Sequence, residues 1–286
     1  MQKTTSGWVS GGIGVAIFAG SLPATRVAVA DLAPIFLTSA RAVIAGVLGL
    51  ALLVGLRQAR PVRGDLFSLA LTAIGVVLGF PLLTALALQH VTAAHSIVFV
   101  GLLPLCTAVF AVLRGGERLR PVFWVFSVAG AACVVGHAAA GDLRASLTGD
   151  LLMLAAIVVC GLGYAEGARL ARRLGGWQVI SWALVLSLPV MLPMAWVTMP
   201  DSFDRVGLGA WIGLGYVSVF SMLVGFFFWY RGLARGGIAA VGQLQLVQPF
   251  LALGLAGVFL NEAVSWGMVV ATLATVGCVA GARRFA

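Results

Sequence analysis

The sequence predicts an all-α integral membrane protein with ten transmembrane helices arranged as two inverted five-helix repeats. Composition is the first observation: 61% of the 286 residues are hydrophobic and 9% are charged, whereas an ordinary soluble domain carries roughly 25% charged residues. The second observation is a series of long apolar stretches, and the third is an internal repeat. Together they exclude a soluble domain of any size.

The apolar stretches have the length of membrane-spanning helices. A hydrocarbon core about 30 Å thick needs about 20 apolar residues per helix. The stretches are continuous and rich in Leu, Ala and Gly, which favours helices over the alternating pattern of a β-barrel. The predicted spans are 8–29, 34–56, 65–89, 91–113, 121–140, 149–171, 177–199, 208–231, 238–260 and 265–283.

The basic residues predict the orientation of these spans. Fourteen of them fall on the side of the N-terminus, three fall on the opposite side, and Arg41 lies within a span. The larger group consists of Lys3, Arg57, Arg60, Arg63, Arg114, Arg118, Arg120, Arg169, Arg172, Arg173, Arg231, Arg235, Arg283 and Arg284. Because cytoplasmic loops carry the excess of Lys and Arg, both termini are expected in the cytoplasm. The short clusters form no basic domain, so nucleic acid is not an expected partner.

The internal repeat relates the two halves of the chain. A proline within an apolar run is followed thirteen residues later by a glutamate, as Pro104 and Glu117 and again as Pro249 and Glu262. The shift of 145 residues is about half the chain, so each half holds five predicted helices. Five is an odd number, and the second half must therefore enter the membrane in the opposite sense. The predicted domains are residues 1–140 and 149–286.

Span 8–29 has a second interpretation. Lys3 and the small residues at 28–30 resemble a cleaved signal peptide. Cleavage would destroy the repeat, so we expect the span to be retained.

The repeated residues have structural roles that the sequence suggests directly. A proline inside a helix removes one backbone hydrogen bond, so Pro104 and Pro249 are either static kinks or hinges of a gating movement. Glu117 and Glu262 are expected to cap the helices that they begin, where a carboxylate meets unpaired N–H groups. Arg41 is expected to have a structural role, bonding helix ends or a carbonyl group.

Three stretches carry a resemblance to a known family. They are "AGSLPATR" (residues 19–26), the arginine of the second helix, Arg41, and "LALQHVTAAHSIVFVGLLPLCTAVFAVLRGGERL" (residues 86–119). With the repeated proline-to-glutamate spacing, they resemble the EamA-type carriers of the drug/metabolite transporter superfamily. The resemblance implies ten helices in two inverted repeats and export of small metabolites. Its nearest branch is that of the amino-acid exporters, including YddG-like exporters of aromatic amino acids.

No motif predicts an enzyme. The sequence lacks HExxH, GxSxG, GxGD and Walker motifs, and its three histidines are dispersed. We therefore expect no catalytic residue, no metal site and no cofactor. The four cysteines fall within predicted spans and are expected to be small core residues.

Polar and aromatic residues within spans predict the substrate site, because polar groups in membrane helices usually face a cavity or the bundle interior. Gln245 and Gln248 share one helical face, whereas Gln243 points elsewhere. Interhelical hydrogen bonding is the alternative role for these glutamines. Glu166 is expected to pair with Arg169, with proton coupling as the alternative. The candidate binding residues are His95, Phe99, Tyr164, Ser221, Trp229, Gln245 and Gln248.

The expected function is export of amino acids, including aromatic ones, or similar small amphiphiles across the inner membrane by alternating access. A facilitative channel, or a carrier for a drug or sugar derivative, is the alternative. The expected partners are a small-molecule substrate and the lipid bilayer, with the chain acting as a monomer.

Overall fold

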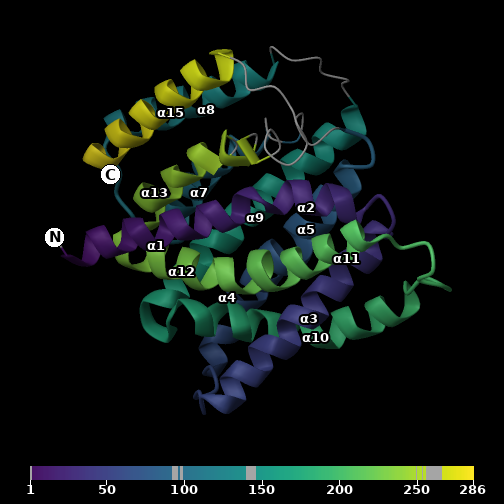
Figure 1. The fold of residues 1–286 in the computed structure, drawn as a ribbon. Helices are drawn as coiled ribbons and strands as arrows, with labels where there is room; N and C mark the ends of the chain where they lie inside the picture. Colours follow the sequence, from purple (N-terminus) through teal and green to yellow (C-terminus); the bar gives the residue numbers. More distant parts are fainter. Residues whose placement is uncertain are drawn as a thin grey trace.

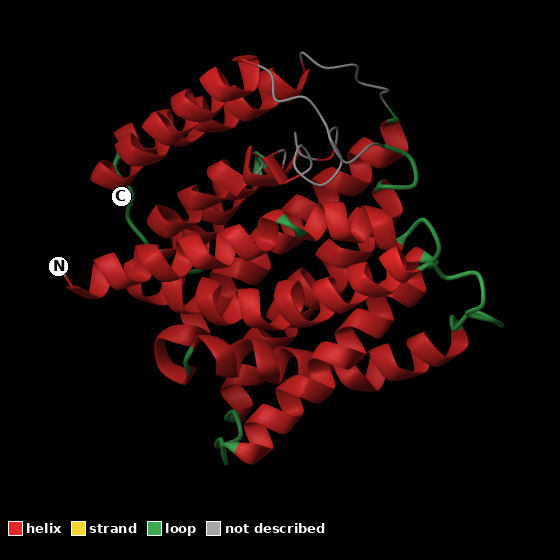
Figure 2. Cartoon of the chain, viewed as in Figure 1, coloured by secondary structure: helices red, strands yellow, loops and turns green. Residues whose placement is uncertain are grey.

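The computed structural model describes residues 2–91, 96, 99–139, 146–248, 250–252, 254–255 and 266–286. All regular structure in these ranges is helical, with no strand (Figure 2). The two ends of the chain lie on the same side of the bundle (Figure 1), where the Arg283 guanidinium stacks 4.6 Å from the ring centre of Trp8. His95, Pro249 and Glu262, which the sequence singled out, lie outside the described residues.

The first half of the chain supplies the helices up to residue 139. They are α1 (Gln2–Ala19), α2 (Ser21–Ala28), α3 (Pro34–Gly55), α4 (Arg63–Thr72), the π-helix η1 (Ala73–Gly79), α5 (Phe80–Ala87), α7 (Leu103–Leu113) and α8 (Pro121–Ala139). The second half begins with one long helix. Its elements are α9 (Leu147–Leu174), α10 (Gly176–Val197), α11 (Leu208–Gly215), the π-helix η2 (Tyr216–Val224), α12 (Gly225–Gly236), α13 (Ile238–Gly242), the 3₁₀-helix η3 (Gln243–Val247) and α15 (Trp266–Phe285).

Among the described residues, six helical segments are long and apolar enough to cross a membrane. They are Thr5–Ala28, Pro34–Gly55, Arg63–Ala87, Leu147–Leu174, Gly176–Val197 and Leu208–Gly236. Shorter apolar helices occupy parts of three further predicted spans, at Leu103–Leu113, Pro121–Cys133 and Ile238–Ala252. The helical, multi-pass character predicted from composition is confirmed, whereas the total of ten spans and their inverted arrangement stay predictions.

The distribution of side chains is the reverse of that in a soluble protein. Large apolar side chains such as Val54, Val125 and Val197 are at least two-thirds exposed, while Glu166 and Gln243 are fully buried. An apolar exterior suits hydrocarbon, and buried polar groups in such a protein mark places where helices bond to each other or line a cavity.

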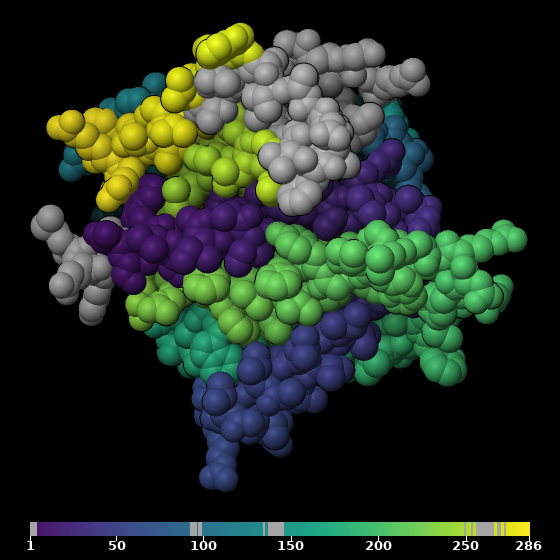
Figure 3. Space-filling view, in the orientation of Figure 1, coloured from purple at the N-terminus to yellow at the C-terminus, as the bar shows by residue number. Residues whose placement is uncertain are grey.

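The most extensive contact between the halves joins α1 to α12, which run side by side across one face (Figures 1 and 3). A Cβ atom on Gly7 would lie 2.7 Å from the backbone nitrogen of Gly236, and one on Gly232 would lie 2.6 Å from that of Gly11. No side chain fits at such distances, so glycine is required at these positions. Close backbone approach through small residues is a common way for helices to associate in lipid.

Loops that the charge pattern assigns to one side of the membrane do gather at one end of the bundle. At that end Glu117 contacts Arg172 and the start of α13, and Asp65 contacts Arg173. At the other end Arg26 donates to the Leu88 carbonyl over 2.6 Å, and the Gly207 N–H donates to Asp31 over 2.9 Å. The fold therefore keeps the two predicted sets of loops apart.

A repeated backbone irregularity also relates the halves. Both long segments Arg63–Ala87 and Leu208–Gly236 contain a π-helix at their centre, η1 and η2. The shift of 145 residues places η1 on residues 218–224, within η2. π-helical turns are rare and occur often at functional sites, so the coincidence marks these two segments as related parts of the molecule.

Candidate transport cavity

A small cavity lies between the halves at the level of the two π-helices. Its volume is about 30 Å³, which holds about one or two water molecules. Residues from both halves line it: Phe18, Ser21, Leu22, Thr25, Arg41, Val76, Phe80, Pro81, Thr84, Leu103, Cys160, Tyr164, Ser221, Phe226 and Gln248. Apolar and ring carbons alternate with a few polar groups, which is the usual composition of a small-molecule site.

Among the described residues that line the cavity, Arg41 is the charged one. It lies in α3, is 6% exposed, and donates from Nη2 to the Ser221 hydroxyl of η2 over 3.3 Å. That hydroxyl also accepts a hydrogen bond of 2.7 Å from Ser21 of α2. Nε of Arg41 has no hydrogen-bond partner. The result is a short polar chain from three elements, with unused donor capacity at Arg41.

Aromatic rings form another part of the lining. Phe226 lies with its ring centre 5.0 Å from that of Phe18 and 5.9 Å from that of Tyr164. Trp229 packs behind these rings, 5.4 Å from Tyr164, and its indole N–H is buried without a hydrogen-bond acceptor. Tilted and edge-on ring pairs of this kind hold aromatic surfaces in fixed positions.

The three glutamines separate as their positions in the sequence predict. Gln248 lines the cavity, and Gln245 is fully buried with both amide atoms unbonded. Gln243 instead donates to Ser127 of α8 over 3.0 Å. Gln248 also bonds between helices, donating from Nε2 to the Phe18 carbonyl of α1 over 3.5 Å. Each of the three keeps an unbonded amide oxygen, and only Gln245 has both amide atoms free.

The local backbone explains how these glutamines are placed. In an α-helix the Gln245 carbonyl would accept from the N–H of residue 249, but proline has none. That carbonyl accepts from the Gln248 N–H instead, which gives the 3₁₀-helix η3 where the sequence predicted a continuous helix. A 3₁₀ turn has three residues, so the side chains of Gln245 and Gln248 come onto one face.

The structure thus brings together three of the predicted binding residues, Tyr164, Ser221 and Gln248, in the cavity lining. Trp229 packs directly behind that lining, against Tyr164. Phe99 packs against the hydrophobic core but does not line the cavity. Sequence reasoning missed Phe18, Thr25 and Phe226, because an apolar or small residue in an apolar run carries no signal of the direction it faces.

Two structural roles need correction. Pro104 is not a kink within a continuous helix: it lies in the first turn of α7, directly after a turn at residues 101–102, and its role as a hinge stays a prediction. A proline costs little there, since first-turn N–H groups have no helical partner. Glu117 does not cap α8, which begins four residues later; its carboxylate accepts from the N–H groups of Ile238 and Ala239 over 2.7 and 2.9 Å and so caps α13.

Arg41 has a different place from the one expected. It bonds to a side chain rather than to a helix end or a carbonyl group, and it faces the cavity. The sequence could show that it lies within a span, but its partner comes from η2, 180 positions away in the chain.

Ion pairs close the end of the bundle near the chain termini. Glu166 is fully buried and accepts from Arg169 over 2.8 Å, as the spacing predicted, and from Arg114 of the α7 end over 2.5 Å. Arg169 also donates to Ser68 of α4. With the pairs Arg172–Glu117 and Arg173–Asp65, the arginines of α9 bind it to both α4 and the loop after α7.

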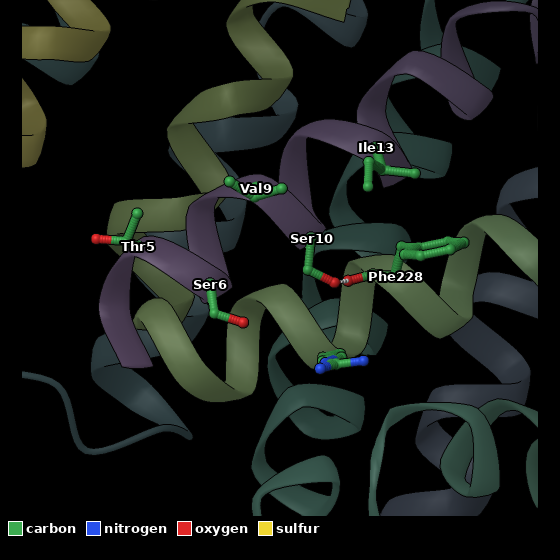
Figure 4. A pocket seen from close by; sticks show the side chains of 7 residues that line it. Thr5, Ser6, Val9, Ser10, Ile13 and Phe228 are labelled. Carbon is green, nitrogen blue, oxygen red and sulfur yellow. Dashed lines mark hydrogen bonds between the residues drawn. The ribbon is translucent and has the colours of Figure 1, made fainter. Parts of the chain in front are cut away.

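A larger hollow of about 530 Å³ lies on the surface between α1 and α12 (Figure 4). Thr5, Ser6, Val9, Ser10, Ile13, Phe228 and Arg231 line it. The Ser10 hydroxyl donates a hydrogen bond of 2.8 Å to the Phe228 carbonyl. The hollow lies apart from the cavity between the halves, and its wide opening onto exposed side chains distinguishes it from a passage through the bundle.

Comparison with known families matches this chain twice to the EamA-like transporter family, at residues 6–136 and 147–283. The uncharacterized transporter YdeK of Bacillus subtilis is 65% identical over 286 residues, the full length of both chains. A probable terminal-alkyne amino-acid exporter of Streptantibioticus cattleyicolor is 28% identical over 254 residues, covering 87% of this chain and 83% of the other.

A solved crystal structure has the same fold. It covers 98% of this chain and 99% of its own, with a TM-score of 0.81 and 22% identity. At that identity the match establishes the arrangement of the chain and leaves its substrate to be inferred from the cavity.

Proposed function

The chain belongs to the EamA-like transporter family, and from that premise we propose that it exports amino acids or similar small amphiphiles across the inner membrane by alternating access. It is a membrane transporter and not an enzyme. The observation that carries the proposal is the cavity between the halves, where polar groups face aromatic rings. An amino acid has a charged backbone and a side chain that is often apolar, and such a lining suits both.

The distant relative from Streptantibioticus cattleyicolor supports this substrate class, because it is named as a probable exporter of an amino acid. The ring wall of Phe18, Tyr164 and Phe226 favours substrates with apolar or aromatic side chains. We propose ten helices in two inverted repeats, with the end that holds the ion pairs facing the cytoplasm.

The size of the cavity favours a carrier over a channel. Its volume of about 30 Å³ is far below the roughly 300–1,000 Å³ of a ligand pocket. Substrate can enter only when the lining moves apart, and the ion pairs of α9 must then open if access is from that end. A channel would instead need a continuous polar pathway.

Counterflow into proteoliposomes tests the proposal. Purified full-length protein would be reconstituted, the vesicles loaded with one amino acid at a time, and uptake of the labelled form measured. Saturable exchange of apolar or aromatic amino acids is the expected result. Exchange confined to drugs or sugar derivatives would contradict the substrate class, and high flux without saturation would favour a channel.

A further inference from the structure

Arg41 is a buried cation that has no anionic partner among the described residues. Its side chain lies in the apolar segment Pro34–Gly55, at 6% exposure. No ion pair joins it to any carboxylate of the described residues, whose ion pairs all lie at the end with the α9 arginines. A buried charge is costly unless it is paired, and an ionisable residue in a membrane span therefore usually serves a function.

The neighbours of Arg41 do not neutralise its charge. Within the described part of the chain its hydrogen-bond partner is Ser221, at 3.3 Å, and this hydroxyl also accepts from Ser21. Gln248, in the same cavity lining, has an amide oxygen without a donor. The lining thus offers hydroxyl and amide groups but no negative charge, and the free Nε of Arg41 leaves an edge of the guanidinium group unoccupied.

We propose that Arg41 binds a carboxylate group of the transported substrate and so restricts transport to carboxylates. The inference rests on the proposed function and adds a requirement to it. A guanidinium group presents N–H donors in a planar fork that matches the two oxygens of a carboxylate. Bound substrate would provide the counter-charge that the described residues around Arg41 lack, with its side chain directed toward the rings of Phe18, Tyr164 and Phe226.

The position of Arg41 also makes the site asymmetric. The residue 145 positions later is Leu186, which lies on α10 and is 40% exposed. Among the described lining residues the cation therefore comes from the first half, while the rings of Tyr164 and Phe226 come from the second. A substrate would bind with its carboxylate toward α3 and its side chain toward α9 and α12.

Pairs of ligands that differ mainly in the negative charge of the carboxylate show whether the site recognises that charge. The probes are L-phenylalanine, L-leucine and benzoate, each compared with its own amide, which has nearly the same shape and no negative charge. Binding would be measured by calorimetry on the purified full-length chain in detergent. The wild-type protein should bind at least one acid about tenfold or more tightly than its amide, because an amide leaves the buried charge unpaired.

Variants at Arg41 assign the preference to this residue. Arg41→Gln should bind acid and amide with similar, weak affinity, so that the preference is lost while the affinity for the amide hardly changes. Arg41→Lys keeps the charge without the planar fork and should retain part of the preference. Arg60→Gln, at an exposed arginine in the loop before α4, is the matched control and should keep the full preference.

The outcomes are distinguishable from those of the amino-acid proposal. The inference would be overturned if a folded Arg41→Gln variant still preferred acids. It would also be overturned if the wild-type protein bound no acid more tightly than its amide. If Arg41→Gln did not fold, the result with Arg41→Lys and the wild-type comparison would decide. If benzoate bound through Arg41 while no amino acid bound or exchanged, the carboxylate site would be supported. The same result would refute amino acids as the substrate class.

Discussion

At the scale of single residues, replacing Gln245 or Gln243 by leucine should change thermal stability and substrate affinity in different ways. Gln245 is buried with both amide atoms unbonded, so Gln245→Leu should leave thermal stability unchanged or raise it, since an unsatisfied polar group is removed. Substrate affinity should fall by about 1 to 3 kcal/mol if the amide contacts the substrate. Thermal unfolding in detergent and calorimetric titration measure the two quantities.

Gln243 is the control for this test. Gln243→Leu removes the 3.0 Å bond to Ser127 and should lower stability by about 1 kcal/mol while affinity is kept. Native affinity in a folded Gln245→Leu variant would remove this residue from the site.

Site residues were predictable from sequence only where their chemistry is unusual for a membrane span. Glutamines in an apolar run are conspicuous, and one of them, Gln248, does line the cavity with an unbonded amide oxygen. Phe18 and Phe226 could not be identified, because a phenylalanine in a span can face lipid or protein equally well. Arg41 was conspicuous too, but its role depends on Ser221 and on the ion pairs formed elsewhere, which only the folded chain shows.

At the scale of elements, Glu117 links the two halves by capping α13. Its two oxygens accept from Ile238 and Ala239, and one also accepts from Arg172. Glu117→Gln removes one of these acceptors and the charge, so we expect a loss of about 1 kcal/mol in the free energy of unfolding. Asp204→Asn, in an exposed loop where the carboxylate contacts only Ser202, should change stability far less. Equal losses in the two variants would contradict the capping role.

The turn before α7 gives a second test at this scale. Pro104→Ala restores an N–H group and allows the helix to continue through residues 101–102, which should slow counterflow several-fold without changing insertion. Pro121→Ala, at the exposed start of α8, replaces another first-turn proline and should leave counterflow unchanged. Wild-type rates in both variants would show that the interruption does not depend on proline.

Helix positions were predictable because the number of residues that crosses a bilayer is fixed, and each described helix overlaps a predicted span. The positions of the π-helices and of η3 could not be predicted in this way. Their turns hold more or fewer residues than an α-helical turn, and which turns differ depends on packing against neighbouring helices. The η3 helix is a partial exception, since the missing N–H of proline 249 could have indicated it.

At the scale of the whole molecule, the separation of the two sets of loops predicts which sites are accessible from each side of the membrane. In a variant without native cysteines, Arg60→Cys and Arg118→Cys should react with an impermeant thiol reagent only from the cytoplasm. Ser202→Cys should react only from outside. Labelling of all three sites from the same side would exclude the proposed topology.

The contact between α1 and α12 imposes an order of events during synthesis. The first helix leaves the ribosome about 200 residues before its partner, and at about 5–20 residues per second that interval lasts about 10 to 40 s. Throughout it the glycine face of α1 has no α12 to pack against. Lipid tails, or another membrane protein, must cover that face, so the first helix of the chain stays in a temporary environment until most of the chain has been made.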